Sequence, residues 1–223
     1  MQTLLTTIVH RPYVIAFLIA FLIIGILNRG VARTLLFLFL GYGIAFLSEF
    51  FSIRIGFPYG LYHYVYENLR GELLLAGVPV WDSLSYSFIV YASYETARWF
   101  RRSTVTAAFL MTLLDVVIDP LAARGDRWFL GRIYYYPEGG LYFGVPLSNF
   151  FGWFLVAFLM IGSFQFLEKK LILSPPPLKA PLLGPLFYYG ILTFNLVITF
   201  WIGEPILGIV GVLLHLGALI GLF

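Results

Sequence analysis

Cysteine is absent from this 223-residue chain, and charged residues make up only 11% of it. Without cysteine the protein forms no disulfide, has no thiolate nucleophile and offers no cysteine ligand for zinc or an iron–sulfur cluster. The basic residues are scattered and the net charge is only +3, so no basic run indicates binding to nucleic acid. These absences exclude thiol chemistry, and no nucleic acid is expected as a partner.

Apolar residues account for 61% of the chain, whereas soluble domains average about 45–50%. The mean hydropathy is +0.91, and windows of about 20 mostly apolar residues, the length that crosses a bilayer, recur along the sequence. Almost nothing is left over for a soluble domain. We therefore predict an all-α, polytopic helical bundle in the cell membrane, formed by a single membrane-embedded domain over residues 1–223.

The apolar windows predict seven transmembrane helices, which place the two termini on opposite sides of the membrane. Loops on the side of the C-terminus carry eight Lys and Arg residues, and loops on the N-terminal side carry six. The positive-inside rule then favours a cytoplasmic C-terminus. The predicted spans are residues 12–27, 34–53, 79–100, 104–121, 144–167, 181–202 and 205–222.

Two long loops on the N-terminal side, residues 55–79 and 121–146, are rich in Gly, Pro and Tyr. Each contains the triplet GLY followed by the triplet GVP. Both loops join a helix running toward the N-terminal side to a helix running back, so the two hairpins match as a parallel internal repeat, whose halves would build one site. The alternative is coincidence, because Gly and Pro recur wherever loops meet helices.

Six polar side chains are predicted at one depth, close to the N-terminal side. An ionisable group inside a membrane span costs several kcal/mol unless it faces a cavity or a partner, so we predict a functional site there. The alternative is a structural polar network, with Arg54, Arg124, Arg127 or Arg132 neutralising the acids. The six residues are Glu49, Asp82, Asp115, Asp119, Asn149 and Glu204.

Asp115 and Asp119 are four residues apart, so on a helix both carboxyl groups project from one face, and Pro120 then ends or bends that helix. Two carboxyl groups this close in a medium of low dielectric do not both ionise readily, so we expect one of them to hold a proton. A protonated acid beside an ionised partner suits general acid catalysis. His63, in the nearby motif GLYHY, is a candidate proton shuttle.

Two further polar residues are predicted to have structural roles. Glu95 lies three residues before Arg98 near the opposite side of the membrane, which predicts an ion pair within one helix. His215 is alone in the last span, and a lone histidine is expected to be a hydrogen-bonded packing residue.

Several motifs occur in a fixed order over Ser48–Phe154: EFFSIRIGFPYGLYHY, GVP, LLDVVIDPLA and YFGVPLSNFFGW. In these residues the chain resembles a family of carotenoid-biosynthesis membrane proteins. The characterised members of that family are carotenoid hydratases, namely bisanhydrobacterioruberin hydratases of archaea and γ-carotene 1′,2′-hydratases of bacteria. The resemblance makes residues 48–154 the motif-bearing core, and no matching motif stands out before it or after Glu168. The family pattern singles out Glu49, Gly56, Pro58, Gly60, Tyr62, Pro79, Asp115, Asp119, Pro120, Pro146, Asn149 and Trp153.

This resemblance implies acid-catalysed addition of water to the terminal double bond of an acyclic isoprenoid end. Such a reaction needs a proton donor, a group that holds water and π faces beside the carbocation, but no metal or redox cofactor. Asp115 or Asp119 would be the acid, and Glu49 and Asn149 would hold the water. The substrate is then a hydrophobic carotenoid in the lipid bilayer, and other membrane enzymes of the carotenoid pathway are candidate partners. The candidate substrate contacts are Tyr62, His63, Trp81, Asp82, Tyr142 and Trp153, of which the tyrosines and tryptophans are the candidates to face the cation.

Two other functions stay open at the level of sequence. DVVID, residues 115–119, has a DxxxD spacing that would suit an intramembrane prenyltransferase, which binds a diphosphate through Mg²⁺. Such enzymes need a second Asp-rich motif, and no other predicted span has one. The second alternative is a carotenoid-binding or lipid-binding membrane protein, or a small transporter, in which the acids form a structural or proton-relay network.

Overall fold

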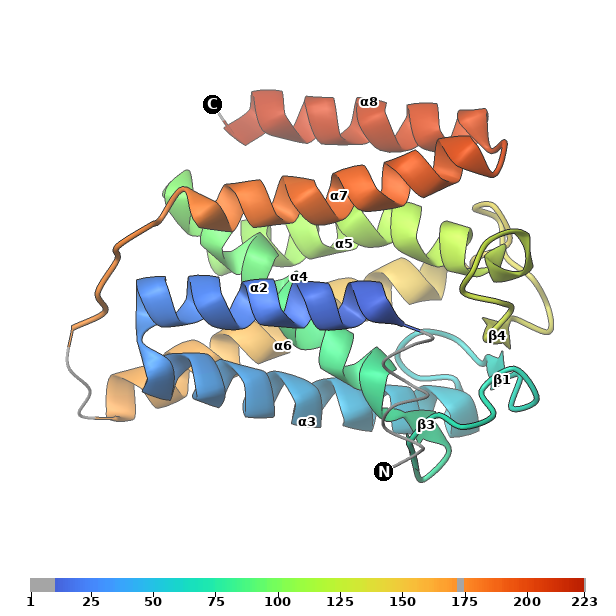
Figure 1. Cartoon of the computed structure of the whole chain (residues 1–223), viewed down its shortest axis with the longest axis horizontal. Helices are drawn as coiled ribbons and strands as arrows, with labels where there is room; N and C mark the ends of the chain where they lie inside the picture. The colour runs from blue at the N-terminus through green and yellow to red at the C-terminus, as the bar shows by residue number, and fades with distance from the viewer. Residues whose placement is uncertain (1–10, 172–174, 223) are drawn as a thin grey trace.

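The computed structural model describes residues 11–171 and 175–222, which form a bundle of seven α-helices (Figure 1). Residues 1–10, 172–174 and 223 of the predicted domain lie outside these ranges. The predicted all-α polytopic bundle is confirmed, and every predicted span corresponds to one helix. The helices are α2 (Pro12–Arg29), α3 (Val31–Ile55), α4 (Val80–Trp99), α5 (Thr104–Ala122), α6 (Leu147–Lys170), α7 (Leu183–Trp201) and α8 (Pro205–Leu222).

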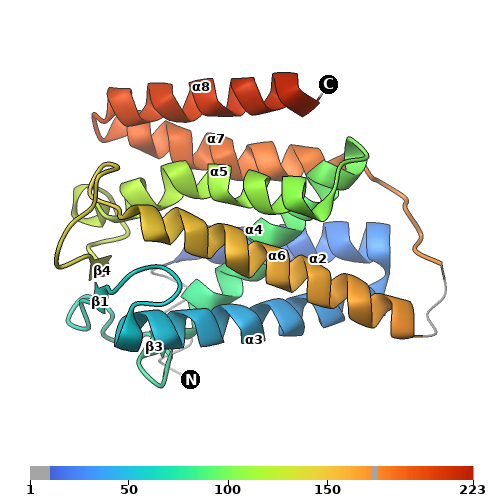
Figure 2. The same ribbon diagram turned by 180° about the vertical axis from the view of Figure 1, so that it is seen from behind.

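Five of these helices, α2, α3, α5, α6 and α7, are long and apolar enough to cross a membrane, and α8 contains a shorter apolar stretch. The helix α4 is more polar, yet it lies in the middle of the bundle and packs against α2, α3, α5, α6 and α7 (Figures 1 and 2). Two of its serines are buried and hydrogen-bonded: Ser87 donates to the carbonyl oxygen of Leu38 at 3.1 Å, and Ser93 to that of Ile89 at 3.0 Å. A helix surrounded by protein can therefore be polar, because its side chains do not meet lipid.

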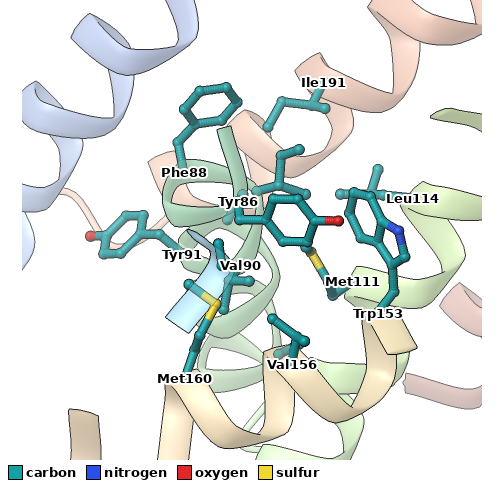
Figure 3. Packing of buried hydrophobic residues seen from close by; sticks show 14 of the residues in the cluster. Tyr86, Phe88, Val90, Tyr91, Met111, Leu114, Trp153, Val156, Met160 and Ile191 are labelled. Atoms are coloured by element: carbon teal, nitrogen blue, oxygen red, sulfur yellow. The ribbon is translucent and has the colours of Figure 1, made fainter. Parts of the chain in front are cut away.

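Apolar side chains of α4, α5, α6 and α7 interlock in the centre of the bundle, as Figure 3 shows. Met111 and Leu114 of α5 lie beside Trp153 of α6, and all three are buried. This packing holds α5 and α6 together along the faces that carry the polar residues predicted for the site.

The two GVP triplets have the same local structure. Gly77 and Gly144 both adopt positive φ angles, 84° and 90°, which favour glycine. Pro79 and Pro146 then occupy the N-cap positions of α4 and α6 in an extended conformation. The helices therefore begin one residue after each proline, and the two triplets act as equivalent helix starts.

Two short ribbons organise the long loops at the end of the bundle where α3 and α5 finish (Figure 1). The strand β1 (His63–Tyr64) pairs antiparallel with β4 (Tyr134–Tyr135), so the two loops are joined to each other. The strands β2 (Leu74–Leu75) and β3 (Val78–Pro79) form a second ribbon within the first loop, and a 3₁₀ turn covers Gly125–Arg127. Because side chains alternate along a strand, β1 and β4 turn every second residue toward the helices.

A buried ion pair fastens the opposite end of the bundle. The Nε atom of Arg29, at the end of α2, donates to Oε1 of Glu95 in α4 at 2.7 Å, and both side chains are almost fully buried. The predicted pair of Glu95 with Arg98 is wrong, because Arg98 instead lies over the ring of Tyr94 at 5.6 Å. The pair with Arg29 forms between helices, so the spacing along α4 could not indicate it.

We predict that Glu95→Ala lowers the free energy of unfolding by about 3–5 kcal/mol, because it leaves the buried guanidinium of Arg29 without its partner. The matched control is Glu168→Ala, which removes the partner of Arg33 in a more exposed pair and should cost no more than about 1 kcal/mol. Unfolding of both variants in detergent measures the difference, and equal losses would contradict a central role for the buried pair.

Candidate active site

A cavity of about 130 Å³ lies inside the bundle at the end covered by the tyrosine-rich loops. Its walls come from all the helices except α8, together with β1 and β4. The ionisable residues Glu49, Asp119, Asp82 and Arg11 line it, and Asn149 lies among them. Most of the remaining wall is aromatic or aliphatic, so polar groups face an otherwise apolar space.

The side chain of Asn149 holds the two aspartates of α5 together. Its Nδ2 atom donates to Oδ2 of Asp115 at 2.7 Å and to Oδ2 of Asp119 at 2.6 Å. Its Oδ1 atom accepts a hydrogen bond from the hydroxyl of Tyr136 at 3.1 Å. Both amide hydrogens are therefore used by carboxyl groups, and none is left to hold a water molecule. Asn149 positions the two carboxyl groups.

The two aspartates differ in their surroundings. Asp119 lines the cavity, and its Oδ1 atom also accepts from the hydroxyl of Tyr134 at 2.9 Å. Asp115 lies behind it with no exposed surface, and its Oδ1 atom has no hydrogen-bond partner in the described parts of the chain. Of the pair, Asp119 is the one that a molecule in the cavity would meet.

Glu49, near the end of α3, is held by two tyrosines of the first loop. Its Oε2 atom accepts from the hydroxyls of Tyr62 and Tyr64, the latter at 2.6 Å. Burial, with the adjacent charge of Glu49, raises the pKa of both phenols well above its usual value, so both stay protonated and donate. Within residues 11–171 and 175–222 no hydrogen bond to the Oε1 atom of Glu49 is present, which leaves this oxygen for a ligand or water.

No arginine or lysine of the described chain forms an ion pair with Glu49, Asp115 or Asp119. Three negative charges buried together without a cation would be very costly. At least one of the three acids therefore holds a proton. This arrangement provides the protonated and ionised carboxyl groups that proton-transfer chemistry requires.

Glu204, predicted in the same cluster, lies apart from the cavity. Arg124 contacts it at 2.8 Å and Arg127 also pairs with it, so the turn between α7 and α8 is tied to the second long loop. Its small degree of burial raises the pKa, but hydrogen bonds and charges from Arg124 and Arg127 outweigh this and lower the pKa below its usual value. For Glu204 the geometry supports a structural role, in which arginines neutralise the acid.

Asp82 is paired with an arginine that the sequence did not single out. Arg11, which precedes α2, binds Asp82 through Nη1 and Glu72 through Nε at 2.9 Å. Burial lowers the pKa of Arg11, but the charges of the two acids more than compensate and raise it above its ordinary value, so Arg11 stays charged. This cluster joins the starts of α2 and α4 to the first loop at the edge of the cavity.

The predicted aromatic contacts divide into two groups. Tyr62, Trp81 and Trp153 line the cavity, and the ring of Trp153 stacks on that of Tyr86 with 4.5 Å between centroids. His63 and Tyr142 do not line it. His63 is exposed because it alternates with Tyr62 and Tyr64 along β1, and Tyr142 packs against Phe143 and Phe150 outside the cavity.

Sequence analysis missed several residues that complete the site. The alternation in YHY (62–64) and YYY (134–136) was an available signal, since it would turn the outer tyrosines of each triplet to one face. No local signal indicated that the two triplets would pair. The missed residues that line the cavity are Arg11, Tyr64, Tyr86, Tyr134 and Tyr136.

Comparison with known proteins gives a family match over residues 9–218, to the family described as "Carotenoid biosynthesis protein". The match extends well beyond the motif-bearing core of residues 48–154. The chain is also similar to bisanhydrobacterioruberin hydratase of Haloarcula japonica, with 30% identity over 147 residues. That alignment covers 62% of this chain but only 45% of the relative, so the chain matches less than half of the relative's length. No solved structure matches it.

We predict that Asn149→Leu destabilises the protein by about 1–3 kcal/mol for each carboxyl group left without its donor. Asn195→Leu is the matched control, because Asn195 is also a buried helical asparagine but donates only to the carbonyl oxygen of Ile191 in its own helix. It should cost less than about 1 kcal/mol. Unfolding in detergent distinguishes them, and equal stability of the two variants would show that the bridging amide contributes little.

Glu204 should make stability depend on acid pH. Its pKa in the folded protein is below the unfolded value of 4.5, so its contribution is complete above that value and is lost as the pH falls through the folded pKa. Relative to Glu204→Gln, the wild type should be more stable near neutral pH by at most about 1 kcal/mol, and this difference should shrink at an acid pH below the folded pKa. Unfolding temperatures of both proteins at the two pH values measure it, and a difference that persists in acid would contradict it.

Proposed function

From the premise that the chain belongs to the family of carotenoid biosynthesis proteins, we propose that it is a carotenoid hydratase. It adds water across the terminal carbon–carbon double bond of an acyclic isoprenoid end. The observation that carries this proposal is a cavity in which Glu49 and Asp119, held by neutral donors and paired with no cation in the described chain, face a largely apolar space. The similarity to bisanhydrobacterioruberin hydratase supports it.

Asp119 is the proton donor in this proposal. Its carboxyl group gives a proton to the CH carbon of the double bond, and the dimethyl-substituted carbon becomes a tertiary carbocation. Burial keeps the acid protonated but also makes it weaker. Tyr134 and Asn149 offset this, because both donate hydrogen bonds to the carboxylate that remains after the proton has left.

Asp115 is a positioning residue in this scheme. It shares the amide of Asn149 with Asp119 and lies behind it. Asp115 has no exposed surface, and its Oδ1 atom has no hydrogen-bond partner in the described parts of the chain, so it is the costlier of the two to ionise and acts by holding Asn149 and Asp119 in place. Asp115 itself does not touch the substrate.

Glu49 directs the water. The two tyrosine hydroxyls hold its Oε2 atom, and the Oε1 atom accepts a hydrogen bond from the water that attacks the carbocation. As the carbon–oxygen bond forms, the proton released by this water passes to Glu49 and then returns to Asp119 through the polar groups of the cavity. One water is consumed, and no oxidant, reductant or metal is required.

Aromatic faces stabilise the carbocation. The stacked rings of Trp153 and Tyr86 are buried and line the cavity next to the polar cluster. A cation near the face of a desolvated aromatic ring gains about 2 kcal/mol or more. In this proposal the rings stabilise the cation, and the water held by Glu49 is the group that captures it.

The geometry disfavours the prenyltransferase alternative. Mg²⁺ bound by both aspartates would need their oxygens to converge on the metal. Oδ2 of Asp115 and Oδ2 of Asp119 converge instead on the amide nitrogen of Asn149, which is a hydrogen-bond donor and cannot ligate a cation. Among the described residues, no group of three or more His, Cys, Asp or Glu side chains could hold a metal ion.

The test is expression in cells that produce acyclic carotenoids, with mass spectrometry of the pigments. The wild type should add one water to each reacting end, and in deuterated water the product should carry one deuterium on the carbon beside the hydroxyl-bearing carbon. Asp119→Asn and Glu49→Gln should lower the rate at least about 100-fold, because general acid–base groups contribute factors of about 100–10,000. Asp115→Asn should have a smaller effect, and Asp126→Asn, on the exposed 3₁₀ turn, none.

Other outcomes would contradict this proposal or indicate a different function. Wild-type activity in folded Asp119→Asn would remove this residue as the acid. Pigment that binds without gaining water would support a carotenoid-binding protein, and a prenylated pigment that appears only with magnesium and a prenyl diphosphate would establish the rival enzyme.

A further inference from the structure

The proposed substrate is much longer than the cavity. A cavity of about 130 Å³ is close in size to the cavity of about 150 Å³ that binds one benzene molecule, so it holds the end of an isoprenoid chain and not a whole polyene. The remainder of the molecule must leave the cavity through one of its walls. Because the polyene is apolar, that wall should open to lipid.

Most of the walls are closed. The loop end is covered by the buried tyrosines of β1 and β4 and by the ion pairs of Arg11. On the helices, Glu49, Phe88, Ile89, Asn149 and Trp153 are each no more than 5% exposed. These walls therefore have other protein behind them, and a tail passing through them would meet further buried groups.

The wall between α2 and α7 is different. Its rings come from Tyr13 and Phe17 of α2 and from Phe194 of α7, and all three line the cavity. Phe194 stacks on Tyr13 with 5.3 Å between centroids and meets Phe17 edge-on at 5.4 Å. All three rings are only partly buried, unlike the helical residues named above, and they join α2 to α7 without a covering element named among the cavity walls.

The depth of this wall also suits an apolar ligand. Phe17 is five residues into α2 and Phe194 is seven residues before the end of α7, which places both about 8–10 Å along the helices from the loop end of the bundle. At this depth a spanning helix meets the hydrocarbon of the bilayer and not the headgroups. In Figure 1 the two helices lie on the face of the bundle toward the viewer, with α4 behind them.

We propose that the aromatic seam of Tyr13, Phe17 and Phe194 is the polyene subsite of this protein, through which the substrate enters sideways from the bilayer and in which its tail lies while the end group reacts. This inference rests on the proposed function. The seam contacts the polyene through the faces and edges of its rings. Of the three side chains, only Tyr13 carries a hydrogen-bonding group, its hydroxyl. No ion pair among the described residues joins α2 to α7, so separation of the two helices at the seam breaks no charge pair.

The absence of native cysteine allows a direct test. In the double variant Phe17→Cys with Phe194→Cys, a short bis-methanethiosulfonate reagent joins the two thiols in the purified, folded protein, and a reductant later removes it. Two quantities are measured in lipid vesicles that contain an acyclic carotenoid: the rate of hydration by mass spectrometry and the uptake of pigment by absorbance. The linked form should lose both at least tenfold, and reduction should restore them.

The control pair joins helices away from the seam. In Arg33→Cys with Glu168→Cys the new side chains replace a partly exposed ion pair between α3 and α6, at the end of the bundle away from the tyrosine-rich loops. Linking this pair should leave both rates unchanged. If Phe17→Cys disturbs folding, Tyr13→Cys with Phe194→Cys tests the same seam.

The two readouts distinguish the proposals. Undiminished pigment uptake by the linked seam variant would overturn the subsite, whether or not hydration occurs. Uptake that the link blocks, without hydration in the wild type, would support the subsite and overturn the hydratase. Failure of the wild type to take up or hydrate any acyclic polyene would overturn both.

Discussion

The site depends on carboxyl groups that are buried in the membrane part of the bundle and held by neutral hydrogen-bond donors. Tyrosine hydroxyls and one asparagine amide contact Glu49, Asp115 and Asp119, and no described arginine or lysine pairs with them. An arginine beside these acids would keep all of them ionised. Neutral donors satisfy the oxygens but let a proton stay in the cluster, so the site can both give and accept one.

This requirement accounts for the long loops. Helices α3 and α5 supply the acids near their ends, but the hydroxyls come from β1 and β4, one in each loop. Pairing of these two strands places tyrosines from both halves of the chain over one cavity. The basic residues of the same region are used elsewhere: Arg11 joins α2 to α4 and the first loop, and Arg124 joins the second loop to the turn before α8.

The bundle separates two environments that the proposed reaction between water and a lipid-soluble molecule needs. Polar groups gather at the loop end, while rings of α2 and α7 surround the cavity at the depth of the hydrocarbon. The central position of α4 makes this possible, because most of its polar side chains are covered by the other helices.

The sequence by itself determined the seven helices, the shared depth of the acids and the placement of Asp115 and Asp119 on one helix face, because hydropathy and helical period are local properties. Asn149 was also predicted at the depth of this pair. Only the tertiary structure decided which groups meet. The pairing of β1 with β4 joins residues about seventy positions apart, and it selects Tyr64 and Tyr134 while turning His63 outward. Glu95 binds Arg29 of another helix and not Arg98 of its own. Such contacts depend on how helices and loops pack across the chain, and spacing along one element does not encode them.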